Sequence, residues 1–164
     1  MKKLICLFLS LCLLSLCLFS CDEDVDPNEG LESYTDFTMQ DLNGNVLTLS
    51  DLVGSPIVLN FWASWCPPCK SEMPDFQEAY SEYGSQIHFV MVSIDDTVSA
   101  AQGFISASGY SFPVYHDSYG QGASAYDITS IPQTYFINSD GYIELSYAHM
   151  ISSSELQAGI DKIK

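Results

Sequence analysis

Positive charge is scarce in this sequence. It contains no arginine, and its 5 lysines stand against 21 aspartates and glutamates, which gives a formal net charge of −16. A surface this acidic repels the phosphate backbone of DNA and RNA. The composition therefore argues against nucleic acid as a partner.

Cysteines that could form a structural disulfide framework are also lacking. Four of the 6 cysteines lie within or directly after an apolar N-terminal run, namely Cys6, Cys12, Cys17 and Cys21. Only Cys66 and Cys69 are left for the folded part, and a disulfide that closes so short a loop removes little entropy from the unfolded chain. We therefore expect this pair to carry out chemistry rather than to stabilise the fold.

Ligands for a metal ion are equally few. Zinc needs about four ligands, usually from two cysteine pairs or from a paired histidine motif. The three histidines, His88, His116 and His149, are far apart in the sequence. We expect no metal site, and no cofactor besides a redox-active disulfide between Cys66 and Cys69.

The N-terminus has the pattern of an export signal. Two lysines precede residues 4–20, an apolar run without charge, which is typical of a signal peptide. The run is short for a membrane-spanning helix, which needs roughly 20 apolar residues. It leads into Leu18-Phe19-Ser20-Cys21, which resembles a bacterial lipobox, although Phe19 is bulkier than usual. We expect residues 1–20 to be a lipoprotein signal peptide and Cys21 to carry the lipid; an uncleaved N-terminal anchor is the alternative.

An acidic segment follows the expected lipidation site. Residues 21–33 include Pro27 and Gly30 and contain almost nothing to bury, so we expect a flexible tether. The tether and lipid predict that the protein is held in the cell envelope, either facing the periplasm or at the outer membrane.

Residues 34–164 alternate between strand and helix patterns and form the expected folded domain. Strands are predicted at 36–39, 46–49, 57–61, 87–94, 111–115, 133–137 and 142–148. Helices are predicted at 66–83, 97–107 and 120–126, and Ser152 is expected to cap a last helix. Turn signals at Asn43-Gly44 and Ser139-Asp140-Gly141 join two of the strand pairs as hairpins. The pattern predicts an α/β sandwich in which helices flank a mixed sheet.

The sequence Cys66-Pro67-Pro68-Cys69 lies where a buried strand passes into a helix. Unpaired backbone N–H groups and the helix dipole favour an anionic sulfur at such a helix start, and the thiolate is the species that attacks a disulfide. Cys69 lies one turn further on, where it can resolve a mixed disulfide. Pro67 and Pro68 stiffen the loop and withhold two N–H donors. We interpret Cys66 as the nucleophile and Cys69 as the resolving cysteine, with Trp65 flanking the thiol.

This motif and its context resemble the thioredoxin superfamily, and within it the TlpA/ResA-like family of exported thiol–disulfide oxidoreductases. The matching positions are Asp36, Phe37, Asp41, Gly44, Leu49, Leu52 and Gly54 before the motif, and Pro74 and Ile131-Pro132-Gln133-Thr134 after it. The elements expected between residues 87 and 115 match a central strand–helix insertion of that family.

The resemblance implies a thioredoxin-like sandwich with an N-terminal hairpin and that insertion. It also implies a cis peptide bond before Pro132, facing the two cysteines. The residues that it assigns to the active-site loop and the substrate groove are Trp65, Pro67, Pro68, Ile131 and Pro132.

Two polar positions distinguish the sequence from the classical thioredoxins. Asn60 occupies the place of a buried aspartate, and Glu72 matches a glutamate of the ResA-like members. Because residues three apart share a helix face, Glu72 can lie beside Cys69, disfavour its thiolate and take its proton. In a chain with 21 acidic residues, a solvated glutamate on the helix surface is an equal alternative.

These features predict an exported, membrane-tethered enzyme that reduces disulfides of envelope proteins, with apocytochrome c maturation as one candidate pathway. A membrane thiol protein would supply the electrons. The same residues serve an oxidase or isomerase when the reaction runs the other way, because direction depends on the reduction potential. A non-catalytic lipoprotein that keeps the fold as a binding module is the third possibility.

Overall fold

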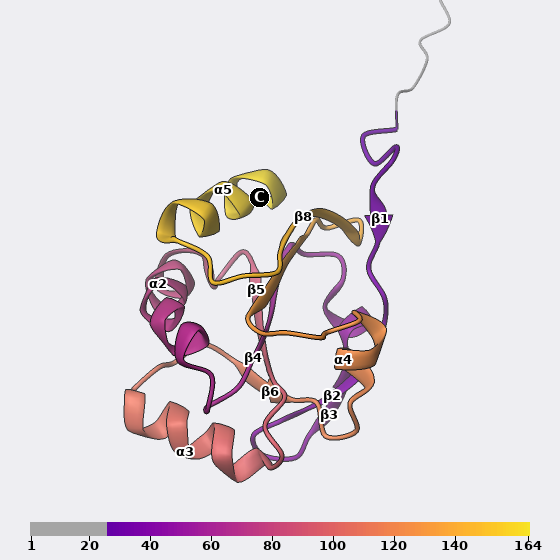
Figure 1. Cartoon of the computed structure of the whole chain (residues 1–164). Coiled ribbons are helices and arrows are strands. Elements are labelled where there is room, and N and C mark those ends of the chain that lie inside the picture. Colours follow the sequence, from indigo (N-terminus) through magenta and orange to yellow (C-terminus); the bar gives the residue numbers. More distant parts are fainter. Residues whose placement is uncertain (1–25) are drawn as a thin grey trace, which may run out of the picture.

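The computed structural model describes residues 26–164, so the expected signal peptide and Cys21 lie outside the described residues. A single eight-stranded sheet has the order β1-β8-β7-β4-β5-β6-β2-β3 (Figure 1). Its strands are β1 Glu32–Ser33, β2 Thr38–Asp41, β3 Val46–Thr48, β4 Ile57–Trp62, β5 His88–Ser93, β6 Val114–His116, β7 Gln133–Ile137 and β8 Tyr142–Tyr147. The helices are α2 Pro67–Tyr83, α3 Val98–Ser108, α4 Gln121–Ala125 and α5 Ser153–Ile163, and a 3₁₀ turn spans Leu49–Leu52.

Strand β4 is the central element of the sheet. It pairs parallel with β5 and antiparallel with β7, and all six of its residues are buried. Because successive side chains point to opposite faces, Val58 and Trp62 join one core cluster and Leu59 and Phe61 join the other. A strand buried on both faces has a continuous apolar sequence. The polar Asn60 is therefore the exception within this run.

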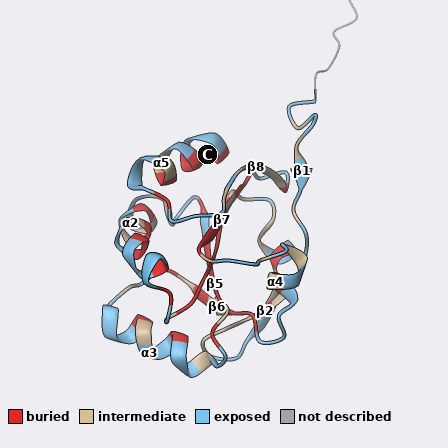
Figure 2. Cartoon of the chain, in the orientation of Figure 1, coloured by how far each residue is buried: buried red, intermediate tan, exposed pale blue. Residues whose placement is uncertain are grey.

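Helices cover both faces of the sheet. Residues of α2, α3 and α5 pack on the core cluster that includes Trp62, and α4 lies on the opposite face with the 3₁₀ turn. Figure 1 shows this division, and Figure 2 shows the buried residues concentrated along the central strands. The expected thioredoxin-like sandwich and the N-terminal hairpin, formed by β2 and β3, are confirmed. None of the helices in residues 26–164 is long and apolar enough to cross a membrane.

Most element boundaries lie within two residues of the sequence-based expectation; β2, for example, spans Thr38–Asp41 instead of 36–39. Two further differences have a clear physical reason. Strand β6 begins at Val114, not at Ser111, because Pro113 has no N–H to donate to a sheet ladder. Glu32 and Ser33, assigned above to the tether, form β1 and pair with Ile143 and Tyr142 at the edge of β8. This pairing uses backbone groups, so the polar, exposed side chains gave no signal for it.

Gly159 allows α5 to pack closely on the sheet, because it has no side chain. A Cβ atom at this position would overlap the ring of Phe136, which is fully buried in β7. We expect Gly159→Ala to lower the free energy of unfolding by about 1–3 kcal/mol, because overpacking outweighs the better helix propensity of alanine.

Gly103→Ala in α3 is the matched control, because a Cβ there meets no described atom within 4 Å. It should raise the free energy of unfolding by about 0.4–1 kcal/mol. Urea denaturation of both variants measures the difference. Equal effects of the two substitutions would contradict the described packing of α5.

Candidate active site

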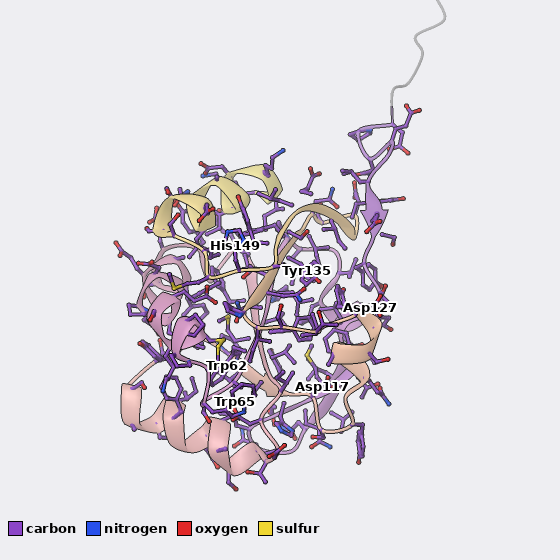
Figure 3. The ribbon with its side chains drawn as sticks, viewed as in Figure 1. Trp62, Trp65, Asp117, Asp127, Tyr135 and His149 are labelled. Carbon is purple, nitrogen blue, oxygen red and sulfur yellow. A yellow bond between two sulfur atoms is a disulfide. The ribbon has the colours of Figure 1, made fainter. Side chains whose placement is uncertain are left out.

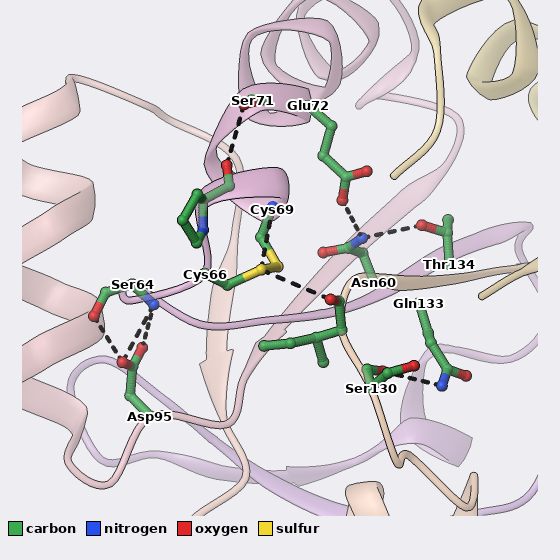
Figure 4. Close-up of a disulfide and its surroundings, with 12 residues drawn as sticks. Asn60, Ser64, Cys66, Cys69, Ser71, Glu72, Asp95, Ser130, Gln133 and Thr134 are labelled. Atoms are coloured by element: carbon green, nitrogen blue, oxygen red, sulfur yellow. Dashed lines mark hydrogen bonds between the residues drawn. A yellow bond between two sulfur atoms is a disulfide. The ribbon is translucent and has the colours of Figure 1, made fainter. Parts of the chain in front are cut away.

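The two cysteines lie at the start of α2, directly after the carboxyl end of β4. Cys66 is the N-cap residue and Pro67 is the first helical residue. Cys66 and Cys69 form a disulfide, and the backbone N–H of Cys69 donates to Cys66 Sγ over 3.2 Å (Figure 4). The expected geometry, a sulfur at a helix N-terminus with its partner within bonding reach, is present.

A groove of about 410 Å³ opens beside Cys66. The residues that line it are all uncharged: Trp65, Cys66, Pro67, Pro68, Ile94, Ile128, Thr129, Ser130 and Ile131. Trp65 is 62% exposed at its edge, whereas Trp62 is fully buried. The groove gives a partner molecule access to the Cys66 sulfur and offers it mainly apolar contacts.

The segment before β7 forms the side of the groove that faces the disulfide. The Ile131 carbonyl oxygen lies 3.9 Å from Cys66 Sγ, and the Ile131–Pro132 peptide bond is cis, as the family resemblance implied. Ile131 lines the groove, but Pro132 is buried and does not. The structure thus brings four of the five expected groove residues to the cavity: Trp65, Pro67, Pro68 and Ile131.

Glu72 is buried, not solvated. Its side chain is 2% exposed, Oε1 accepts from Asn60 Nδ2 over 3.0 Å, and Oε2 accepts from the backbone N–H of Ile151 over 3.0 Å. Burial raises the pKa of this carboxyl to about 7, against the opposing effect of the two hydrogen bonds. A carboxyl with this pKa can exchange protons near neutral pH.

Asn60 connects the helix to the sheet below the disulfide. Its Nδ2 also donates to Thr134 Oγ1 in β7 over 3.0 Å, and both residues are fully buried (Figure 4). Asn60 stood out in the sequence, but its partner Thr134 and the partner of Glu72, Ile151, did not. A polar residue within the apolar run of β4 was the available signal, since buried polar groups require partners.

Comparison with known proteins agrees with this geometry. Residues 32–146 match the model of the AhpC/TSA family. The thiol-disulfide oxidoreductase ResA of Oceanobacillus iheyensis is 42% identical over 106 residues, which cover 64% of this chain and 55% of that protein. ResA of Bacillus subtilis is 38% identical over 108 residues, which cover 65% and 60%. The matched segment thus spans less than two thirds of the length of these two relatives.

A solved structure shares the architecture. The crystal structure of a DsbE-type thiol:disulfide interchange protein from Chlorobium tepidum has a TM-score of 0.73 and 28% sequence identity, and the match covers 79% of this chain and 94% of that one. The family match, the two relatives and the shared fold all include the segment with Cys66 and Cys69. The chain therefore belongs to the AhpC/TSA family, and it is similar to the ResA thiol-disulfide oxidoreductases.

Proposed function

We propose that the protein is an exported, lipid-tethered thiol–disulfide oxidoreductase that reduces disulfides of envelope proteins, with apocytochromes c among the candidate clients. The proposal that the pair reduces its client, rather than oxidising it, rests on the buried Glu72. This residue lies on the same helix face as Cys69. When this carboxyl is ionised, above pH about 7, its negative charge disfavours a thiolate on the pair. A dithiol whose thiolate is disfavoured is a stronger reductant, because its disulfide form is relatively more stable.

The reaction follows from the positions of the two sulfurs. The Cys66 thiolate attacks one sulfur of the client disulfide, and the other client sulfur leaves as a thiolate. Cys69 then loses its proton to Glu72 and attacks Cys66 Sγ, which releases the second client thiolate and forms the Cys66–Cys69 disulfide. Two electrons pass from the pair to the client. A dithiol of a membrane thiol protein reverses these steps and restores the pair.

Pro67 and Pro68 act in the same direction as Glu72. They are the first two residues of α2, where backbone N–H groups would otherwise point at the sulfur. Proline has no N–H, so the helix start stabilises the thiolate less than an ordinary one does. Both features favour a reductase over an oxidase.

The described part of the tether suits a membrane-anchored enzyme. Figure 3 shows that the chain enters the domain at the end opposite to Trp65, which marks the groove. An anchor at Cys21 would therefore attach to the side of the domain away from the groove, which leaves the groove open to envelope proteins.

Reduction of a disulfide-bonded protein, with a dithiol as electron donor, tests the catalytic proposal. The wild-type protein should accelerate the reaction, Cys66→Ser should fall to the rate without protein, and Cys69→Ser should accumulate a mixed disulfide with the client. Wild-type protein that is no faster than Cys66→Ser would refute exchange at this pair and favour a binding module.

The pH dependence of stability tests the state of Glu72. The folded protein keeps a proton on this carboxyl up to pH about 7, whereas the unfolded chain loses it near pH 4.5, so the folded state binds more protons between these values. Stability should therefore fall as pH rises through this window, by on the order of 3 kcal/mol. Urea denaturation of the oxidised protein from pH 4 to 8 measures this slope.

Glu72→Gln is the matched variant for that measurement. It removes the titrating group, and its loss of one hydrogen-bond acceptor adds a cost that does not change with pH. The slope attributed to Glu72 should therefore be absent from the profile of the variant and should appear in the difference between the two proteins. A parallel pH profile for both would show that Glu72 does not titrate in this range.

Membrane fractionation tests the lipid anchor. We expect Cys21→Ser to release the protein from membranes, because the only proposed lipid attachment site is lost. Cys17→Ser is the matched control, since this cysteine lies in the proposed signal peptide and should leave anchoring unchanged. Membrane retention of Cys21→Ser equal to that of the control would contradict lipidation at residue 21.

A further inference from the structure

Asp95 is a buried acid that the exchange reaction described above does not use. It lies two residues beyond β5, and its side chain is 4% exposed. No lysine or histidine in residues 26–164 forms an ion pair with it. A buried carboxylate without a cation must be stabilised by hydrogen-bond donors.

The donors come mainly from the loop that carries the nucleophile. The backbone N–H of Ser64 donates to both carboxylate oxygens, over 3.0 and 3.2 Å, and Ser64 Oγ donates to Oδ1 over 2.7 Å (Figure 4). Ser93 Oγ, at the end of β5, donates to Oδ2 over 2.7 Å. Ser64 precedes Cys66 by two residues, so the carboxylate fixes the chain immediately before the reactive sulfur.

The sheet explains why these residues meet. Strands β4 and β5 are parallel, and Trp62 is opposite Ser93 in the ladder. Ser64 and Asp95 each lie two residues beyond this pair, so both leave the same edge of the sheet side by side.

The backbone of Asp95 makes a contact of its own, to a histidine in the neighbouring strand β6. Its carbonyl oxygen lies 2.7 Å from Nε2 of the buried His116 in β6. His116 Nδ1 lies 2.9 Å from Ser118 Oγ, which donates to Gln40 Oε1 in β2 over 3.1 Å. This chain of contacts connects the N-terminal hairpin to the active-site loop through the buried His116 and the exposed Ser118.

We propose that Asp95 is a positioning residue for thiol–disulfide exchange at Cys66. Its carboxylate holds Ser64 and thereby places the sulfur at the groove, and its uncompensated charge disfavours the Cys66 thiolate. The first effect increases the exchange rate, and the second keeps the pair reducing. The inference rests on the proposed exchange at Cys66 and Cys69, and it holds for either direction of net electron flow.

Three variants separate these effects. Asp95→Asn removes the charge, but its Oδ1 can still accept from Ser64 and its Nδ2 can donate to Ser93. Asp95→Ala removes both the charge and the acceptor. Asp117→Ala is the control, because Asp117 is a buried aspartate after β6 whose carboxylate accepts from the backbone N–H of Ala123 over 2.7 Å and not from Ser64.

Two measurements report directly on the cysteine pair and need no client protein. These are the rate at which the reduced protein reacts with oxidised glutathione and the equilibrium constant of that reaction. We expect Asp95→Ala to be slower by roughly 10-fold or more, since small displacements of a reacting atom are costly, and Asp95→Asn and Asp117→Ala to stay within about 3-fold of wild type. The equilibrium for Asp95→Asn should move at least about 3-fold toward reduced protein.

Any of three results would overturn the positioning role. These are an Asp95→Ala rate within the wild-type range, a failure of Asp95→Asn to restore the rate, and equal slowing by Asp117→Ala. An unchanged equilibrium in Asp95→Asn would overturn the effect of charge. If Asp95→Ala does not fold, Ser64→Ala, which deletes only the Oγ donor, must itself slow the reaction for the proposal to stand. A wild-type pair that does not react with glutathione at all would instead refute the proposed exchange chemistry.

Discussion

The active site depends on one buried contact, the hydrogen bond between Glu72 in α2 and Asn60 in β4. It ties the helix that presents the two cysteines to the central strand of the sheet, and the second carboxylate oxygen ties the same helix to Ile151 before α5. Because ionised glutamate is costly to bury, these two donors are what allow the carboxyl to remain in the core at all. The same group that joins three elements therefore also sets the electrostatic environment of the dithiol.

Opposing electrostatic effects act on the cysteine pair. The start of α2 favours an anionic sulfur, whereas in the proposed mechanism Glu72, the two prolines and Asp95 reduce that advantage. The nucleophile must be a thiolate to attack, but a thiolate that is too stable makes a poor reductant. Under the proposed function, a helix N-terminus combined with two buried carboxyls meets both requirements, and the uncharged groove would recognise a client mainly through apolar contacts.

The sequence predicted those parts of the molecule that depend on local pattern. The apolar run of β4, the helix after Cys66 and the cis bond before Pro132 follow from residues within a few positions of each other or from the family motif. Burial of Glu72 could not be predicted, because it depends on Ile151, which is 79 residues away. The contact between Ser64 and Asp95 required knowing that β4 and β5 are neighbours, and β1 was missed because edge pairing uses only backbone groups.

The reduction potential of the Cys66–Cys69 pair tests the central claim most directly, measured for the wild type and for Glu72→Gln. The account predicts a reducing pair, at about −200 mV or below and thus near the range of thioredoxin and glutaredoxins, and a less negative value when the carboxylate is removed. A potential near that of the strong oxidant DsbA, about −120 mV, or no change in Glu72→Gln, would contradict it.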